Sequence, residues 1–172
     1  MLNKKITNAL NEQINKEMYS AYLYLAMSAY SDHKGLKGFA NWFYTQYQEE
    51  MEHAMRIYYY IQEQGEQVTL KAIEKPPEEF GTPLETFQKT LEHEKFVTKS
   101  IHDLVDLAVQ EKDHASQIFL QWFVSEQVEE ESNANDIIDK LNMVGKQGNG
   151  LFMIDKELGA RVFKSELTSE GE

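Results

Sequence analysis

Acidic side chains and one histidine interrupt apolar stretches at several places in this sequence. Glu50 and His53 lie three residues apart in the segment Q-E-E-M-E-H, between the apolar segments F-A-N-W-F-Y and R-I-Y-Y-Y-I. Comparable interruptions occur at Glu17, Glu94, Gln127 and Glu130. Carboxylates with a single imidazole and no thiolate suit iron or manganese, and tolerate zinc. Each residue alone could equally belong to a solvated helix face, so the elements that carry these residues must decide.

The composition limits the possible functions. A chain of 172 residues with 41% apolar and 27% charged residues is typical of one soluble globular domain. The net charge of -12 argues against nucleic acids and anionic membranes as partners and favours cations. The absence of cysteine excludes disulfides, iron–sulfur clusters and Cys-rich zinc sites. No signal peptide or membrane-spanning run is recognisable, so a cytoplasmic protein is expected.

Helical periodicity dominates and predicts five helices. The expected ranges are about 3–32, 39–64, 83–111, 114–145 and 151–163. G-L-K-G at 35–38 is the expected first turn, and Gly65 is an expected C-terminal stop. Thr82-Pro83-Leu84-Glu85 has the pattern of a capping box with proline in the first turn.

The remaining breaks complete the predicted organisation. Asp113 is the expected N-cap of the fourth helix, and Gly148-Asn149-Gly150 is expected to break the chain before the fifth. Residues 1–165 are predicted to form a single domain, and 166–172 a frayed tail.

The lengths of the connections predict how the helices are arranged. Short turns join the first helix to the second and the third to the fourth, so each pair forms an antiparallel hairpin. The middle link, 66–81, can cover ~50 Å at ~3.3 Å per residue. That exceeds the length of a helix of about 27 residues at ~1.5 Å per residue. The sequence therefore predicts an all-α, four-helix bundle with one long crossover and a short C-terminal fifth helix.

The core-facing stripe of each helix is apolar near both ends and polar in the middle. Glu17 and His53 each lie 18 residues from the centre of the first turn. Glu94 and Glu130 each lie 18 residues from the centre of the second. Residues equally far from a hairpin turn lie level, here ~27 Å along the helices. The polar residues of all four helices should therefore meet at one height, in the middle of the bundle.

A metal centre accounts for such a layer of carboxylates. Buried carboxylates are costly, and no Lys or Arg occupies a stripe position to neutralise them, which leaves protons or metal ions. Di-iron bundles use a Glu from each of two helices and Glu-x-x-His from each of the other two. Glu17, Glu94 and Glu50-x-x-His53 fit this pattern, whereas the fourth helix departs from it with Gln127-x-x-Glu130.

These segments resemble those of prokaryotic non-haem ferritins. The similarity covers about 2–163 and is carried by N-E-Q-I-N-K-E-M-Y-S-A-Y-L-Y-L (11–25), Q-E-E-M-E-H-A (48–54), L-E-H-E (91–94) and F-L-Q-W-F-V-S-E-Q-V-E-E-E (119–131). The resemblance implies a ferritin-like fold and a ferroxidase that oxidises Fe(II) to Fe(III) with O2 or hydrogen peroxide. It also implies self-assembly into a hollow shell of twenty-four subunits that stores the ferric mineral.

Carried over by position, the resemblance implies a di-iron centre with a third iron site beside it. The first iron would bind Glu17, Glu50 and His53; the second would bind Glu94 and Glu130, with Glu50 bridging. Gln127 would lie next to both irons and could donate a hydrogen bond to a bound oxygen species. The third site would comprise Glu49, Glu126, Glu129 and Glu130, of which the last three share a helix face. Glu52 and Glu131 are expected to be solvated.

Two aromatic residues have two interpretations each. Tyr24 lies on the same face as Glu17, two turns away, and in this family lies near the iron centre, where it could donate an electron. Trp122 lies one turn before Glu126 and could do the same. Core packing is the alternative for both.

Haem and the other histidines are interpreted differently. Met51 follows the motif's Glu, where haem-containing relatives place their haem ligand, but the fourth helix lacks Glu-x-x-His, so no haem is expected. The remaining histidines lie off the stripes and are expected to be solvated: His33, His93, His102 and His114. The last of them, with Asp113, could border an ion channel.

Two other functions remain open from the sequence. A di-iron peroxidase or oxygenase could use the same bundle, although rubrerythrin-type proteins usually add a Cys-rich domain. A mini-ferritin-like shell that protects DNA would place its metal ligands between subunits, whereas the ligands here lie within one chain.

Overall fold

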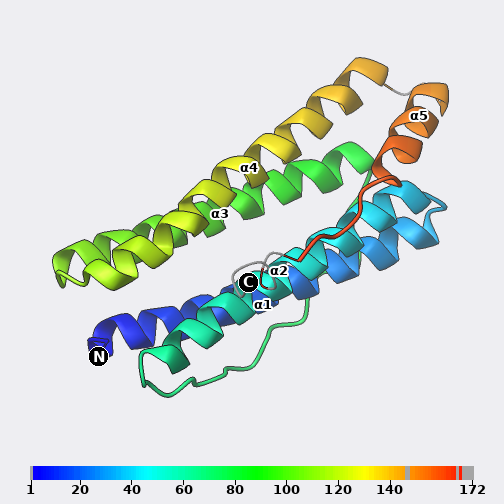
Figure 1. Ribbon diagram of the computed structural model, residues 1–172. Helices are drawn as coiled ribbons and strands as arrows, with labels where there is room; N and C mark the ends of the chain where they lie inside the picture. Colours follow the sequence, from blue (N-terminus) through cyan, green and yellow to red (C-terminus); the bar gives the residue numbers. More distant parts are fainter. Residues whose placement is uncertain (1, 146–147, 166, 168–172) are drawn as a thin grey trace.

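The computed structural model describes residues 2–145, 148–165 and 167. Its helices are α1 (Lys4–His33), α2 (Lys37–Glu63), α3 (Pro83–Gln110), α4 (His114–Val144) and α5 (Gly148–Leu158). Figure 1 shows two long hairpins, α1 with α2 and α3 with α4, lying along one another, with α5 at one end. The predicted all-α bundle with a long crossover and a short fifth helix is confirmed.

Of the tail that the sequence predicts to be frayed, 166–172, all but Leu167 lies outside the described residues. None of the helices in the described part of the chain combines the length and the apolar character needed to cross a membrane.

Local capping fixes the ends of the long helices as predicted. The Thr82 side chain accepts a hydrogen bond from the backbone N–H of Glu85, and the Glu85 carboxylate accepts one from the Thr82 N–H (2.7 Å), which completes the capping box. Asp113 caps α4 by accepting from the Ser116 N–H. Gly65, just after α2, has a φ of +76°, a left-handed conformation that glycine adopts without steric cost.

The long crossover between α2 and α3 is attached to α1. Asn11 accepts a hydrogen bond from the Thr69 N–H, and the Asn15 amide donates to the Ala72 carbonyl. Near the end of the crossover, Phe80 is buried in the core with 1% of its surface exposed. The crossover therefore runs the length of the bundle while its backbone remains anchored by side chains of α1.

The predicted range of the fifth helix, about 151–163, is wrong at both ends. α5 begins at Gly148 and ends at Leu158, so the Gly-Asn-Gly segment forms its first turn instead of breaking the chain. The segment that follows Leu158 is not helical and runs back along α2 (Figure 1). Helix propensity alone did not reveal this, because α5 is positioned by a contact with the beginning of α2.

That contact is a helix cap supplied from a distant part of the chain. Leu36, the N-cap residue of α2, offers no capping side chain. The Asp155 carboxylate of α5 accepts instead from the N–H groups of Gly38 (2.8 Å) and Phe39 (3.0 Å). A Cβ on Gly38 would lie 1.5 Å from the Asp155 carbonyl oxygen, so only glycine permits this approach. A carboxylate at a helix N-terminus also interacts favourably with the helix dipole.

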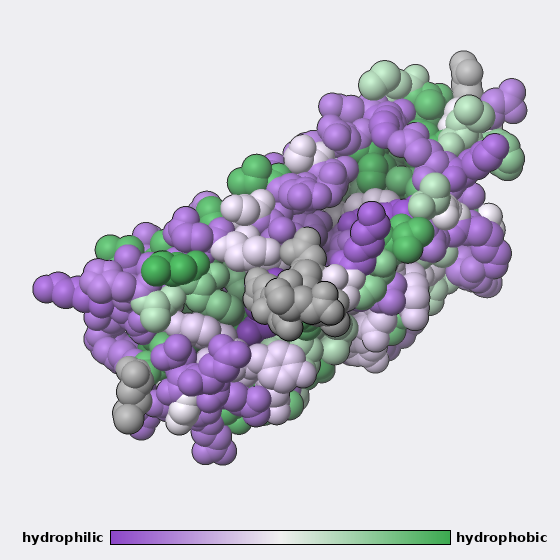
Figure 2. Space-filling model, viewed as in Figure 1, coloured by the Kyte–Doolittle hydropathy of each residue, from purple (hydrophilic) through white to green (hydrophobic). Residues whose placement is uncertain are grey.

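Two apolar clusters fill the bundle on either side of a polar middle layer. One cluster includes Leu10, Ile14, Ile57, Ile101 and Phe123. The other includes Tyr24, Phe39, Phe43, Phe87 and Ile137. Hydrophilic residues cover much of the face seen in Figure 2, with smaller hydrophobic patches between them. Burial of the apolar clusters therefore holds the four helices around the polar layer.

Candidate metal centre

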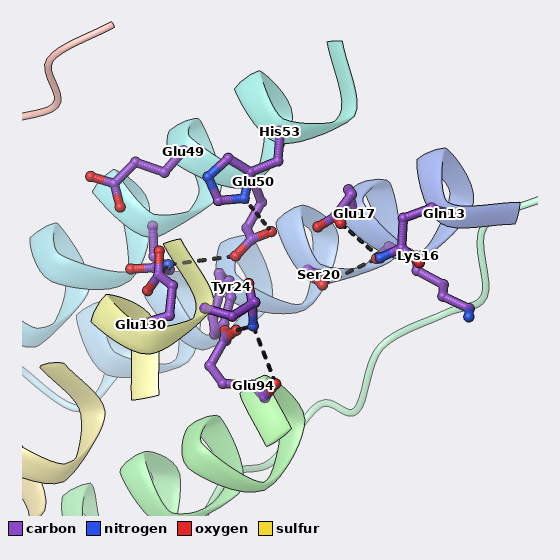
Figure 3. Close-up of polar contacts among 12 residues, drawn as sticks. Gln13, Lys16, Glu17, Ser20, Tyr24, Glu49, Glu50, His53, Glu94 and Glu130 are labelled. Carbon is purple, nitrogen blue, oxygen red and sulfur yellow. Dashed lines mark hydrogen bonds and ion pairs between the residues drawn. The ribbon is translucent and has the colours of Figure 1, made fainter. Parts of the chain in front are cut away.

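One half of the polar layer is formed by α1 and α2. The Glu17, Glu50 and His53 side chains converge there (Figure 3), and one ligand atom from each lies within 4.8 Å of the others. Their exposed fractions are 1%, 1% and 4%. The hairpin thus brings Glu17 to the height of Glu50 and His53, as the residue count predicts.

These three side chains direct unsatisfied atoms toward one another. Within the described residues, Glu17 Oε2, Glu50 Oε2 and His53 Nδ1 are buried without a hydrogen-bond partner. His53 Nδ1 lies 3.4 Å from Glu50 Oε2 without forming an aligned hydrogen bond. The other Glu17 oxygen accepts from the Gln13 amide at 2.8 Å, which fixes the carboxylate. Unsatisfied buried ligand atoms are costly, and a bound cation would satisfy all three at once.

The other half of the layer, from α3 and α4, differs because neither of its described carboxylates, Glu94 and Glu130, has an oxygen that is buried without a hydrogen-bond partner. The Tyr24 hydroxyl donates to Glu94 Oε1, and the Gln127 amide donates to Glu94 Oε2 at 3.2 Å. The Gln46 amide donates to Glu130 Oε2 at 2.7 Å. Gln127 therefore contacts Glu94, while Glu130 is held from α2.

The electrostatics of the layer favour protons or cations. Burial, followed by the neighbouring Glu50 charge, raises the pKa of Glu17 to about 8. Burial, followed by the charge of Glu94, holds the pKa values of Glu50 and Glu130 well above their ordinary range. Burial also raises the pKa of Glu94, although the Tyr24 hydrogen bond opposes this. Four carboxyl groups at one height therefore take up protons unless a cation replaces them.

A polar pocket lies beside the paired centre and includes the residues expected at a third site. Glu49, Glu126, Glu129 and Glu130 all line it. Ligand atoms of His53, Glu126 and Glu130 lie within 4.8 Å of one another, so His53 takes part in both groups of possible ligands. Glu129 is exposed, whereas Glu49 is in an ion pair with Arg161 at 2.5 Å. The sequence pattern did not predict this cation, because Arg161 lies beyond the four long helices.

The aromatic residues lie close to the centre. Tyr24 is fully buried, and burial together with the Glu94 charge holds its pKa well above 10. The Trp122 ring lies edge-on to the His53 ring, with 5.3 Å between the centroids. The Arg56 guanidinium lies 4.0 Å from the centroid of the Trp122 ring. Both aromatic residues thus pack in the core and also contact proposed ligands or their neighbours.

Three surface predictions require correction. Glu52 is buried, with 9% of its surface exposed, and accepts a hydrogen bond from the Leu167 N–H. His93 is half-buried; its Nε2 lies 2.8 Å from Ser20 Oγ, and burial lowers its pKa to about 4. Glu131 is half-buried and accepts from the Thr98 hydroxyl at 2.6 Å. The residues that cover these side chains come from other helices or from the C-terminal segment, which the periodicity of one helix does not reveal.

The other three histidines off the stripes are exposed as predicted: His33, His102 and His114. Met51, the position that haem-containing relatives use for a haem ligand, is half-buried.

The predicted stripe of the first helix does not include Gln13, yet this side chain is fully buried. Its amide oxygen accepts a hydrogen bond from the Ser100 hydroxyl.

The fold and this layer define a four-helix-bundle protein with a carboxylate-rich metal centre. Comparison with known proteins identifies the family: the ferritin-like domain model matches residues 7–144. The bacterial non-heme ferritin of Staphylococcus saprophyticus is 46% identical over 163 residues, which cover 95% of this chain and 98% of that protein. The Staphylococcus aureus protein of the same name is 43% identical over 166 residues, covering 96% of this chain and 100% of that protein.

Solved structures agree with the sequence comparison. A ferritin from Archaeoglobus fulgidus, engineered into a closed form, has a TM-score of 0.94 and 51% identity, covering 95% of this chain and 100% of that one. The open-pore ferritin of the same archaeon has a TM-score of 0.93 and 51% identity, covering 94% and 100%. The chain belongs to the ferritin family, as one of its prokaryotic non-haem members. Its function is iron storage with a ferroxidase site, for which Glu17, Glu50, His53 and Glu130 provide the candidate ligands.

Proposed function

We propose that two Fe(II) ions are the substrates of the polar layer and that each half of the layer binds one. Glu17, Glu50 and His53 bind the first ion. Glu94 and Glu130 bind the second, with Glu50 shared between the two. The observation that carries this proposal is the convergence of three buried, unpartnered ligand atoms within 4.8 Å.

The side chains support oxidation by O2 or hydrogen peroxide through positioning and charge. With O2, each Fe(II) gives up one electron, and O2 with two electrons and two protons becomes hydrogen peroxide. Glu50, between the two halves, holds the substrate ions close together, and this proximity favours a two-electron step. Carboxyl groups that are protonated in the metal-free layer release protons when iron binds. In this proposal Gln127 donates a hydrogen bond to an oxygen species, and Tyr24 acts as an electron donor beside Glu94.

A third iron is proposed to bind in the outer pocket. Its ligands would be Glu49, Glu126, Glu129 and Glu130, and the grouping of His53 with Glu126 and Glu130 supports this position. Glu130 would then connect the outer pocket to the paired centre. Trp122, beside His53, is a candidate for a further electron donor.

We further propose that the chain assembles with itself into a hollow shell of twenty-four subunits that holds the ferric mineral. Large apolar side chains are exposed where α4 ends and α5 begins: Met143, Phe152 and Met153 have exposed fractions of 79%, 68% and 66%. Such a patch suits an interface with further copies. The cytoplasmic location stays a prediction from the sequence.

The assignment of the centre is tested by oxygen consumption. Fe(II) is first added without oxygen, O2 is then admitted, and the initial rate of its consumption is measured. Glu50→Ala and His53→Ala should each lower the initial rate by about 100-fold, because each removes a ligand of the reacting ion. Glu92→Ala and His102→Ala are matched controls, since both side chains are exposed, and they should keep the wild-type rate. Wild-type rates in both Glu50→Ala and His53→Ala would refute the assignment.

Particle size and iron content test storage. After aerobic loading with Fe(II), electron microscopy should show a large hollow particle. Its iron content per chain should be far above the two ions that each centre binds. A dimer that retains only two iron ions per chain would instead identify a di-iron enzyme, such as the peroxidase considered above.

A further inference from the structure

The segment after α5 forms a strap over α2. Residues 159–165 leave α5 and run back along α2 toward the middle of the bundle (Figure 1). The Asn41 side-chain amide donates to the carbonyl oxygens of Leu158 (3.3 Å) and Arg161 (2.9 Å). These hydrogen bonds fix the backbone of the strap one turn before the polar layer begins on α2. The strap is therefore a built part of the structure at the position of Arg161.

The Arg161 side chain is held from three directions. One guanidinium nitrogen donates to Gln46 Oε1 at 2.8 Å, and another donates to Glu49 Oε2 at 2.5 Å. The guanidinium also lies 4.6 Å from the centroid of the Trp42 ring, a favourable cation–π distance. The side chain is 22% exposed, so these contacts are partly shielded from solvent. A planar fork of donors is suited to holding two acceptors at once.

Arg161 determines which way the buried Gln46 amide points. Arginine has no hydrogen-bond acceptor, so the Gln46 oxygen must face it and the amide nitrogen must face the polar layer. That nitrogen donates to Glu130 Oε2 at 2.7 Å and lies 3.5 Å from Glu50 Oε1. Without Arg161 the amide could rotate and present its oxygen to two carboxylates, which repels them.

We propose that Arg161 is a positioning residue of the ferroxidase centre, which orients Glu130 for Fe(II) through the Gln46 amide. This inference rests on the function proposed above. The ion pair with Glu49 anchors the guanidinium but is not the route of the effect. The strap thus links the C-terminal end of the chain to the geometry of the second iron position.

Three variants of the full chain test this proposal: Arg161→Gln, Arg161→Lys and the strap control Val162→Ala, whose side chain is exposed. Anaerobic titration with Co(II), followed by its visible absorption, reports the geometry of each bound ion. Arg161→Gln should weaken the second Co(II) per chain roughly tenfold, about the effect of losing one charge-assisted hydrogen bond. The first Co(II) should be weakened much less, because the Gln46 amide reaches only Glu50 of its ligands, at 3.5 Å. Arg161→Lys should restore the affinity for the second Co(II) only in part, because a lysine ammonium does not present the planar pair of donors that a guanidinium has. Val162→Ala should match the wild type.

The Glu49→Gln background separates the two contacts of Arg161. If the effect passes through Gln46, Arg161→Gln should slow oxygen consumption by the same roughly tenfold factor in both backgrounds. Three results would each overturn the proposal. Arg161→Gln could leave oxygen consumption unchanged in the Glu49→Gln background, it could weaken the binding of both Co(II) ions equally, or it could change neither Co(II) binding nor oxygen consumption. If the wild type itself consumes no oxygen with Fe(II), the proposed function fails; an active wild type with an equally active Arg161→Gln refutes only the role of Arg161.

Discussion

Replacing Glu17 with glutamine should stabilise the metal-free protein at neutral pH. Glu17 is 1% exposed, and burial, with the Glu50 charge, raises its pKa from 4.5 to about 8. Glutamine resembles the protonated carboxyl in shape and charge. Gln13 can still donate to its amide oxygen, and the new amide nitrogen would replace the unpartnered Glu17 Oε2 in the group with Glu50 and His53. The substitution therefore removes the ionisation while it keeps the local hydrogen bonds.

The size of the effect follows from proton linkage. Between pH 4.5 and about 8, folded Glu17 keeps a proton that the unfolded chain releases, so the free energy of unfolding falls as the pH rises through this window. At pH 7 the interval above 4.5 is 2.5 pH units, and at ~1.36 kcal/mol per unit this is about 3 kcal/mol. Any proton shared with Glu50 reduces that figure. At pH 5 the same reasoning leaves less than about 1 kcal/mol.

Thermal unfolding of metal-free wild type and Glu17→Gln between pH 5 and pH 8, followed by circular dichroism, measures this difference. The Tm of the wild type should fall relative to that of the variant as the pH rises, with Glu92→Gln, an exposed carboxylate, as the control. Added Zn(II) should reverse the order, because it stabilises the chain that retains the Glu17 carboxylate ligand more than the variant that lacks it. Parallel pH dependences for wild type and Glu17→Gln would refute the reasoning, as would a metal-free variant that is less stable at pH 7.

The other predictions concern single contacts. Gly38→Ala should cost about 1–3 kcal/mol by displacing α5, because the new Cβ would collide with the Asp155 carbonyl; amide hydrogen exchange confined to α5 measures this. Asp155→Ala should cost about 1 kcal/mol, seen as a lower Tm, because α2 loses its cap. Tyr24→Phe should slow oxygen consumption roughly tenfold, because Glu94 loses a hydrogen-bond donor; an unchanged rate would leave Tyr24 a packing residue.

The sequence was sufficient to predict the four long helices and the level at which their polar residues meet. Residue counts from the two turns placed Glu17 beside Glu50 and His53, and the structure brings these three together. This worked because helical rise is uniform, so distance from a turn converts directly into height. The capping box at Thr82 was equally accessible, since it depends on neighbours in sequence.

What could not be predicted depends on contacts between distant segments. The predicted range of α5 is wrong because the position of α5 is set by the contact of its Asp155 with the first turn of α2. Gly38 in that turn has no side chain, which allows the Asp155 backbone to approach. Glu52 is buried by a backbone group more than 100 residues away in the chain. Arg161 likewise reaches Glu49 from outside every predicted stripe. The periodicity of one helix describes its face, but not which segment covers it.

The two halves of the centre differ in a way that bears on turnover. Glu17 Oε2, Glu50 Oε2 and His53 Nδ1 have no hydrogen bonds to lose when a metal binds. Glu94 and Glu130 already accept from amides, and a metal that uses those oxygens must displace bonds of about 1.5–3 kcal/mol each. We therefore expect the first half to retain metal more firmly than the second. The same amides can recapture the carboxylates when oxidised iron departs, which lowers the cost of release. In α4, Gln127-x-x-Glu130 takes the place of Glu-x-x-His. This difference thus favours a centre that releases iron rather than one that retains it.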